Sequence, residues 1–434
     1  MSEFFEIAYA AASNRLCLLT GTGFSKAVSN NQAPGWKQLL IEVCNLLPDS
    51  KILLKALFPP DGNSLLSLEE AAQVISIELA REGKDIHEEI TKIISLVKLI
   101  GNNSDISDFL KKYPVRVVTT NYDKLIEGLI GSTDCQSITP GLPVPRSQSR
   151  VKVYHVHGSI DSPMNMVVTS DDYFRFINGE SYFSRKLSTV LHENTVVILG
   201  YSLGDNNLKA ILSDYKGFSR NHFIGSNIFF VSRQKVSQPV KDYYAHCYGI
   251  RVIDNTTVKD FFISLNTAMS EAETRAKRSV DNINKVIYEG KEFSDSFIKI
   301  ENSFFEIVSS LAAIGLSIND KRVVLALKKI LTKKIELTQK SSAWEQYEHL
   351  ARWLSYLASI LELKGSAIES TYLKAALKSM ETMSRDYAYG FSWHAYKAWD
   401  SRWNGIIASN RALIRKHIED NTNHSAALIV VRKS

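Results

Sequence analysis

Four short segments of the chain place glycine, amide, carboxylate or imidazole groups directly after an apolar run. Glycine lets backbone amides approach a phosphate closely, and an amide or carboxylate can orient water. An imidazole titrates near neutral pH and can act as a general base. Together these groups are suited to binding a nucleotide and acting on it. The segments are residues 21–25, 119–123, 155–158 and 200–205.

The first segment follows the apolar run at 16–20. Gly21 and Gly23 allow close approach of a phosphate, and Ser25 could open a helix whose N-terminus favours negative charge. A full dinucleotide fingerprint has a third glycine where this chain has Lys26. By itself the segment fits a dinucleotide-binding turn and an ordinary strand-to-helix connection equally well.

The second segment, "TTNYD", ends an apolar run with Thr120 and continues with Asn121 and Asp123. One interpretation is helix capping, since Asn and Asp are favoured at helix starts. The other is a ligand site, because doubly wound sheets bind ligands at the carboxyl ends of their strands. The segment alone leaves both open.

The third segment, "VYHVHGSID", contains two candidate histidines. His155 and His157 alternate with apolar residues, so their side chains are expected on the same face of a strand. Gly158 follows His157 and leaves its ring accessible. We therefore expect His157 to be the catalytic histidine and His155 to be structural.

The fourth segment, "GYSLGD", is a further strand-to-helix turn. Gly200, Ser202 and Asp205 suit a ribose or a phosphate, although a glycine-rich helix cap explains the same residues.

These segments need a sheet to bring them together. Six β-branched, mostly continuous apolar runs are typical of parallel strands covered on both faces. They predict a Rossmann-like, doubly wound α/β domain over residues 1–272, with a helical insertion at about 60–105, where the strand spacing far exceeds one crossover. The expected strands are 16–20, 115–120, 151–156, 196–200, 228–231 and 250–253.

Residues 273–434 are predicted to form a mainly helical second domain. Apolar spacing there is helical, and only the tail "AALIVVRK" indicates a strand. Residues 271–434 contain 25 basic and 19 acidic side chains, which permits nucleic-acid contact but indicates it only weakly, since a solvated helix face explains the same pattern.

In order and position the four segments resemble the sirtuin superfamily, and most closely its divergent branch in bacterial anti-phage defence. The family's glycine-alanine-glycine turn and serine match Gly21, Thr22, Gly23 and Ser25. Its threonine-glutamine-asparagine-x-aspartate motif matches residues 119–123, its histidine-glycine pair 157–158 and its glycine-threonine-serine-leucine turn 200–203. The resemblance covers about residues 10–270.

Two departures separate the chain from protein deacetylases. Its four cysteines contain no pair spaced for the usual zinc ribbon, so no zinc and no other metal site is expected. The proline-aspartate-phenylalanine-arginine segment is replaced by Pro34, Gly35 and Trp36. Trp36 could line the nicotinamide pocket or belong to the core. The defence branch shares this replacement, which makes deacetylation doubtful.

The resemblance implies NAD⁺ as the substrate, cleaved at the nicotinamide glycosidic bond. It implies that Asn121 orients water, that His157 contacts the nicotinamide ribose as general base and that Asp123 binds the carboxamide or ribose. Backbone amides around Gly21, Gly23 and Ser25 would face the phosphates. Further cofactor-binding residues are expected to be Thr22, Trp36, Thr120, Gly200, Ser202 and Asp205, with Ser202 and Asp205 near the adenosine ribose.

The resulting prediction is an NAD⁺ hydrolase that depletes NAD⁺ in abortive anti-phage defence. The alternatives are a sensor of NAD⁺ or a signalling nucleotide without turnover, and an NAD⁺-dependent deacylase or ADP-ribosyltransferase. The resemblance further implies a homo-oligomer and an assembly or regulatory role for residues 273–434, and the architecture suggests a HerA-type hexameric ATPase as partner. Without an apolar run of membrane-spanning length or a secretory leader, we expect a cytoplasmic protein with no membrane contact.

Overall fold

The centre of the molecule is a seven-stranded sheet in which every strand pairing is parallel. A computed structural model describes residues 3–60, 62–131, 133–144, 149–178, 182–202, 212, 228–313, 319–340 and 343–433. The sheet order is β3-β4-β2-β1-β5-β6-β7. The strands are β1 (Leu16–Thr20), β2 (Arg116–Thr119), β3 (Cys135–Ile138), β4 (Val151–His155), β5 (Thr195–Leu199), β6 (Ile228–Val231) and β7 (Ile250–Ile253).

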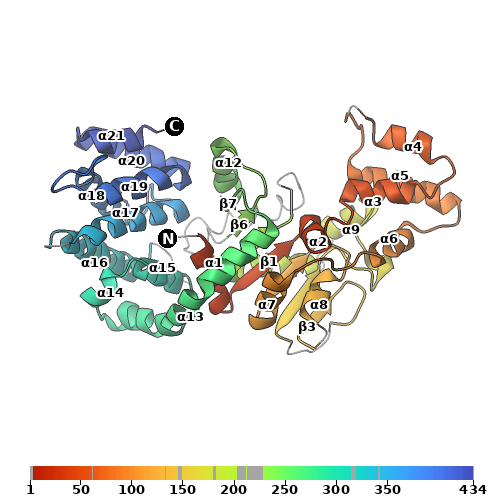
Figure 1. Ribbon diagram of the computed structural model, residues 1–434, viewed down its shortest axis with the longest axis horizontal. Helices are drawn as coiled ribbons and strands as arrows, with labels where there is room; N and C mark the ends of the chain where they lie inside the picture. Colours follow the sequence, from red (N-terminus) through yellow and green to blue (C-terminus); the bar gives the residue numbers. More distant parts are fainter. Residues whose placement is uncertain are drawn as a thin grey trace.

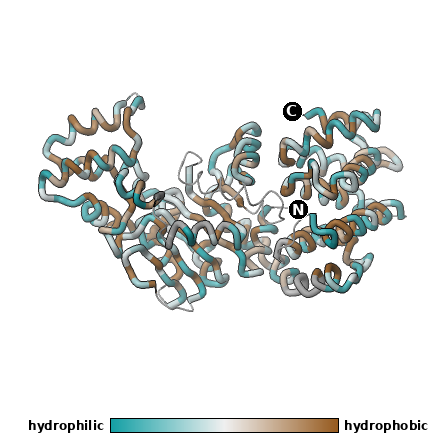
Figure 2. The backbone as a smooth tube through the Cα atoms, turned by 180° about the vertical axis from the view of Figure 1, so that it is seen from behind, coloured by the Kyte–Doolittle hydropathy of each residue, from teal (hydrophilic) through white to brown (hydrophobic). Residues whose placement is uncertain are grey.

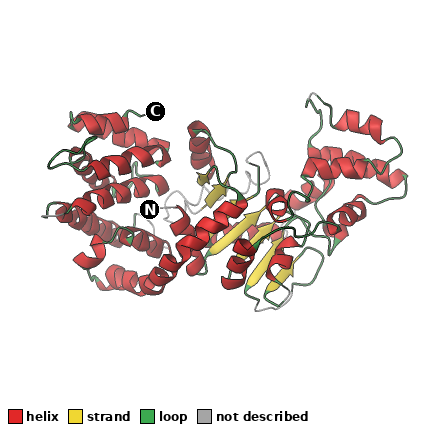
Figure 3. Cartoon of the chain, viewed as in Figure 1, coloured by secondary structure: helices red, strands yellow, loops and turns green. Residues whose placement is uncertain are grey.

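The strand order changes direction at β1, which pairs with β2 on one side and β5 on the other. Both faces of the sheet are covered, and β1, β5 and β6 are buried at every position. The predicted doubly wound parallel sheet is therefore confirmed, and the carboxyl ends of β1, β2, β4 and β5 meet at one edge. Figure 3 shows the strands in the middle of the molecule with helices on either side.

The predicted helical insertion lies between β1 and β2. After α2 (Thr22–Val28) it contains α3 (Trp36–Cys44), α4 (Ser50–Leu57), α5 (Leu68–Arg81) and α6 (Ile86–Ser95), and α7 (Ser104–Lys112) leads back to the sheet. Helices α3 to α6 share a hydrophobic cluster and form one end of the molecule (Figure 1). Helix α5 begins with a capping box between Ser67 and Glu70, which fixes its N-terminus.

The remaining helices of the sheet region connect or cover the strands. They are α8 (Leu125–Ile130), α9 (Ser170–Asn178), α10 (Tyr182–Glu193) and α12 (Gln238–Tyr248), together with α1 (Glu3–Ala12) and α13 (Val258–Glu289), which pack against one another. Helix α13 passes without interruption through residue 272. The division into two domains at that residue stays a prediction.

The C-terminal part consists of helices stacked at the opposite end of the molecule from α4 (Figure 1). They are α14 (Asp295–Lys299), α15 (Ser303–Ala313), α16 (Lys321–Thr338), α17 (Trp344–Ile360), α18 (Glu369–Glu381), α19 (Trp393–Arg402), α20 (Ala408–Asn421) and α21 (Ser425–Val431). Their apolar segments face inward in Figure 2. No helix within the described ranges combines the length and hydrophobicity needed to cross a membrane.

Two details of the sequence prediction were wrong. The tail "AALIVVRK" is not a strand but helix α21, whose buried Ala426, Ala427, Val430 and Val431 recur at helical spacing against the neighbouring helices. A lone strand there would have no partner for its backbone hydrogen bonds. Strand β3 was missed because its sequence, "CQSI", is short and polar, as edge strands often are.

Candidate nucleotide site at the strand ends

The two glycine turns at the sheet edge are in direct contact. The amide of Gly21 donates to the carbonyl of Leu199 at 3.0 Å, and the amide of Gly23 donates to the carbonyl of Gly200 at 2.8 Å. A Cβ on Gly23 would lie 2.7 Å from the Cα of Gly200, and one on Gly200 would lie 2.1 Å from the amide nitrogen of Phe24. Gly200 has φ +71°, so both its conformation and its neighbours require glycine.

Three polar residues from two strand ends form one hydrogen-bonded network. The Ser25 hydroxyl donates to Asp123 Oδ2 at 2.6 Å, and the Asn121 side-chain amide donates to Ser25 Oγ at 2.8 Å. Because the single proton of Ser25 goes to the carboxylate, its oxygen must accept from the NH₂ group of Asn121. The carbonyl oxygen of the Asn121 side chain is therefore turned away from Ser25.

Asp123 anchors this network from a half-buried position. Its Oδ1 also accepts from the backbone amide of Leu125 at 3.1 Å, at the start of α8. Burial raises the pKa of Asp123, although the Ser25 hydroxyl and the Leu125 amide partly oppose this by stabilising the carboxylate. Asp123 thus accepts from a backbone amide at the start of α8 and also from Ser25, which in turn holds Asn121.

The two histidines occupy different environments. His155 is fully buried, and its ring nitrogens contact the Asn121 carbonyl at 3.1 Å and Glu127 Oε1 at 2.8 Å. Burial raises the pKa of Glu127, but His155 and Lys124 more than offset this and lower it to about 2. His155 thereby holds the backbone at Asn121, in the structural position expected for it.

His157 lies at a cavity of about 890 Å³ that opens at the carboxyl ends of the strands. Its ring packs edge-on against Tyr173 and Phe176 of α9, with centroid distances of 5.5 and 5.0 Å. Asn121, Asp123 and Thr120 line the same cavity. The structure thus brings together the three predicted catalytic residues.

We call this space the acidic cavity because of its charges. Among the described residues that line it, Glu69, Glu70 and Asp123 carry carboxylates and none is a lysine or arginine. The insertion supplies its outer wall through the first turn of α5, at residues 67–70. The cavity therefore favours a cationic group.

Trp36 forms another part of this wall. It lies at the start of α3, lines the acidic cavity and packs edge-on against Tyr122 at 6.2 Å. It also contacts the hydrophobic cluster of the insertion. Its indole Nε1 is buried and has no hydrogen-bond partner among the described residues. Both interpretations of Trp36, as pocket wall and as core residue, apply at once.

A second cavity of about 770 Å³ adjoins the first across the glycine turns. Both cavities are lined by Thr22, Gly200, Tyr201 and Ser202. The second also lies over the end of β6, the loop between β7 and α13 and the first turn of α13, and we call it the basic cavity. Its described lining contains no aspartate or glutamate but four cations, Lys26, Arg233, Lys235 and Lys259.

The other predicted site residues fall at this junction or outside the described residues. Thr120 and Tyr201 share a hydrogen bond of 2.8 Å between their hydroxyls. Gly21 lines the acidic cavity and Gly23 the basic one. Asp205 lies outside the described residues. Within the described part of the chain, no three His, Cys, Asp or Glu side chains are grouped as metal ligands would be.

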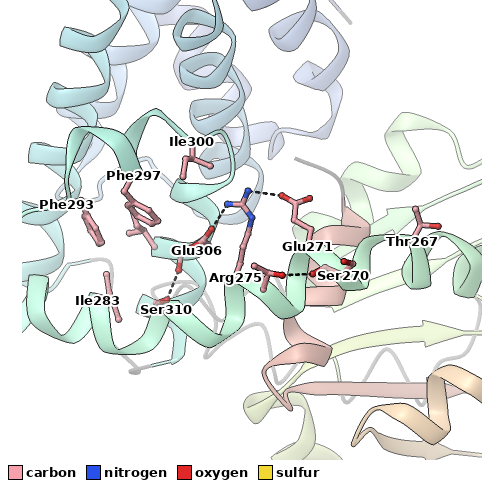
Figure 4. Close-up of a pocket in the computed structure, with 12 residues that line it drawn as sticks. Thr267, Ser270, Glu271, Arg275, Ile283, Phe293, Phe297, Ile300, Glu306 and Ser310 are labelled. Atoms are coloured by element: carbon pink, nitrogen blue, oxygen red, sulfur yellow. Dashed lines mark hydrogen bonds and ion pairs between the residues drawn. The ribbon is translucent and has the colours of Figure 1, made fainter.

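A third cavity, of about 560 Å³, lies among α13, α14 and α15 in the helical part (Figure 4). Its polar end consists of Arg275, which pairs with Glu271 at 2.9 Å and Glu306 at 2.6 Å. It contains none of the predicted site residues. The candidate site is therefore the pair of cavities at the sheet edge.

Sequence reasoning missed several residues of this site. Glu69, Tyr173 and Arg233 belong to segments that carry no recognisable motif. The only available signal was position, because Arg233 comes two residues after an apolar strand. The bridging role of the Ser25 hydroxyl had no signal, since its partner is 98 residues away.

A doubly wound parallel sheet with paired cavities at its switch point places this chain in the class of α/β proteins whose sheets bind ligands at that position. Residues 115–253 match the SIR2-like domain family, and the chain therefore contains a sirtuin-like domain. The match includes Asn121, Asp123, His157 and Gly200 but not the first glycine turn.

Individual relatives point in the same direction. The chain is 26% identical to Defense-associated sirtuin 2 of Bacillus subtilis over 157 residues, which cover 34% of this chain and 15% of that protein. It is 32% identical to the NAD(+) hydrolase ThsA of Enterococcus faecium over 137 residues, 29% of this chain and 28% of that one. It is 29% identical to the NAD(+) hydrolase ThsA of Bacillus cereus (strain MSX-D12) over 123 residues, which cover 26% of each chain. Each match spans less than a third of the relative's length.

Proposed function

We propose that the protein is an NAD⁺ hydrolase that releases nicotinamide and ADP-ribose. The observation that carries the proposal is the division of charge between the two cavities. NAD⁺ has a cationic pyridinium at one end and an anionic pyrophosphate in the middle. The acidic cavity, which holds Asn121 and His157, suits the pyridinium, and the glycine turns and the basic cavity suit the phosphates. The ThsA relatives, named NAD(+) hydrolases, support this reaction.

The network around Asn121 gives that residue a defined task. Asp123 and Ser25 hold its NH₂ group, which leaves its carbonyl oxygen to accept a hydrogen bond from water at the anomeric carbon. Water forms the new C–O bond as the C–N bond breaks, and nicotinamide leaves with the bonding electron pair as a neutral molecule.

His157 is the candidate for the proton released by that water. The edge-on contacts with Tyr173 and Phe176 limit the rotation of its ring. An imidazole can take the proton and pass it to solvent. Most of the rate acceleration would come from positioning and fixed dipoles rather than from a covalent intermediate.

The test is product analysis with matched variants. The purified protein, with NAD⁺ in excess, should release equal amounts of nicotinamide and ADP-ribose. Asn121→Ala and His157→Ala should each lower kcat at least about 100-fold, the usual effect of losing a positioned catalytic group. Asn45→Ala and His246→Ala, which alter residues outside both cavities, should retain activity. Full turnover by a folded Asn121→Ala protein would contradict the mechanism.

The same assay separates the alternatives. A sensor would bind NAD⁺ without releasing nicotinamide. A deacylase would need an acylated peptide and yield O-acetyl-ADP-ribose, and a transferase would leave ADP-ribose on a protein.

The biological setting is also a proposal. The similarity to Defense-associated sirtuin 2 supports a role in anti-phage defence, in which depletion of NAD⁺ stops the infected cell. An unrestrained NAD⁺ hydrolase would harm its host, so we propose that the protein acts as a regulated homo-oligomer. Co-purification with a HerA-type ATPase would test that partner. The effect of added nucleic acid on NAD⁺ turnover would test nucleic acid as a trigger.

A further inference from the structure

We propose that the basic cavity binds the 2′-phosphate of an adenosine ribose, so that the protein hydrolyses NADP⁺ as well as NAD⁺. The inference rests on the proposed NAD⁺ hydrolase function and names a further subsite of the same site. The reaction is the same: water and NADP⁺ give nicotinamide, 2′-phospho-ADP-ribose and a proton.

The position of the basic cavity fits the adenosine end of a dinucleotide. It adjoins the acidic cavity at Thr22, Gly200 and Ser202. A dinucleotide with its nicotinamide beside Asn121 would pass its pyrophosphate over the glycine turns. Its adenosine would then reach the ends of β5 and β6, beyond which Ser232, Arg233 and Lys235 follow.

The cations of this cavity have no acidic partner among the described residues. Lys26, Arg233 and Lys235 make no side-chain hydrogen bond or ion pair with any described residue, and Lys259 donates only to the backbone carbonyl of Asn102. Nearby, Lys241 pairs with Asp254 at 3.0 Å. The basic cavity therefore holds positive charge that an anionic ligand would neutralise.

The number of cations exceeds what the pyrophosphate alone explains. Glycine-turn amides can bind a pyrophosphate without any basic side chain. An arginine at this position is the usual means of accommodating a 2′-phosphate, because its planar fork can bind two phosphate oxygens. Arg233, directly beyond β6, is placed for this role.

The decisive measurement uses binding of adenosine 2′,5′-bisphosphate and 5′-AMP to the full-length protein by calorimetry. The two probes differ only in the 2′-phosphate, and neither can be hydrolysed at a nicotinamide bond. We expect the bisphosphate to bind at least about tenfold more tightly, as one or two charge-assisted contacts would produce. The double variant Arg233→Ala/Lys235→Ala should remove this difference. Arg81→Ala, a cation outside both cavities that pairs with Glu78, should retain it.

Turnover then tests the consequence for substrate choice. The ratio of kcat/KM for NADP⁺ to that for NAD⁺ should fall about tenfold in the double variant relative to the wild-type protein. Equal binding of the two probes, a difference that survives in the double variant, or hydrolysis of NAD⁺ with no detectable hydrolysis of NADP⁺ would overturn the proposal. If the difference in probe binding is present but neither dinucleotide is hydrolysed, the phosphate subsite stands and the proposed hydrolase function fails.

Discussion

The side chains around Asn121 show how its neighbours fix the orientation of one residue. The sequence singled out Asn121, Asp123 and His157 as candidate catalytic residues. It could not predict that Ser25 fixes the amide orientation of Asn121, because that contact joins residues from two separate strand ends. Glu69 was equally hidden, since it reaches the acidic cavity only through the placement of an inserted helix.

At this scale we predict that Glu69 favours the nicotinamide cation. Its side chain is half-buried at the acidic cavity and has no hydrogen-bond or ion-pair partner among the described residues. Glu69→Gln should weaken NAD⁺ binding to the inactive Asn121→Ala protein about fivefold, roughly 1 kcal/mol for a partly screened charge pair. The affinity for ADP-ribose, which lacks the cation, should change much less.

Calorimetry with both ligands measures this selectivity. Glu78→Gln makes the same change near the other end of α5, where Glu78 pairs with Arg81, and serves as the control. An equal loss of affinity for NAD⁺ and ADP-ribose in Glu69→Gln would show that its charge does not select the cation.

Turns and helices set the geometry in which these residues act. The strand runs were predictable because parallel strands buried on both faces need continuous apolar sequence. The glycine turns were predictable as turns, but the contact between Gly23 and Gly200 was not, since nothing in either segment specifies the other. The placement of α9, which carries Tyr173 and Phe176 to His157, likewise depends on tertiary contacts alone.

The contact between the turns predicts a large effect of Gly200→Ala. The substitution adds a methyl group 2.1 Å from the Phe24 amide nitrogen in addition to straining a residue with φ +71°. Gly83→Ala is the matched control, because Gly83 has φ +69° and no atom within 4 Å of the added carbon. In urea unfolding, Gly200→Ala should lose at least about 2 kcal/mol more than Gly83→Ala. Equal losses would mean that backbone strain alone matters.

Helices α6 and α9 are joined by a pH-sensitive contact. His87 Nε2 lies 3.1 Å from Asp172 Oδ2. Burial lowers the pKa of His87, but the hydrogen bond and charge of Asp172, with Asp85, more than offset this and raise it. Asp172 has a lowered pKa, because bonds from His87 and Thr169 outweigh its burial.

Since the folded-state pKa of His87 is raised, its stabilising contribution is full below the unfolded value of about 6.5 and is lost as pH rises through the folded value. The Tm of His87→Gln should therefore lie furthest below the wild-type Tm near pH 5.5, and the two Tm values should approach each other by pH 8.5. A Tm difference that does not change with pH would contradict the charged pairing.

Across the whole molecule, the sheet and the C-terminal helices share one hydrophobic core. Phe305 of α15 packs edge-on against Phe5 and Tyr9 of α1, with centroid distances of 5.3 Å in both cases. The apolar spacing predicted a helical second half but gave no indication that α1, at the N-terminal end, would pack against it. Such contacts depend on shape complementarity between segments about 300 residues apart, which local patterns do not encode.

This shared core predicts that both parts unfold together. Five of the six tryptophans lie in the C-terminal helices or at their ends, so Trp36→Phe leaves fluorescence that reports on that part alone. The urea unfolding transition followed by this fluorescence should coincide with the transition followed by circular dichroism, which reports on the whole chain. Phe305→Ala should lower the common midpoint, with a cost of about 3–5 kcal/mol. Two separate transitions would show that the parts are energetically independent.

The position of β1 in the sheet also governs when the site can form during synthesis. Leu16 pairs with Thr195, so the central strand emerges from the ribosome long before its second neighbour exists. Gly23 meets Gly200 only after that pairing. Contacts so distant in sequence form late and slowly. A nascent chain shorter than about 200 residues therefore lacks Gly200 and the contact between the two glycine turns, so the topology of the fold delays assembly of the site until most of the sheet has been made.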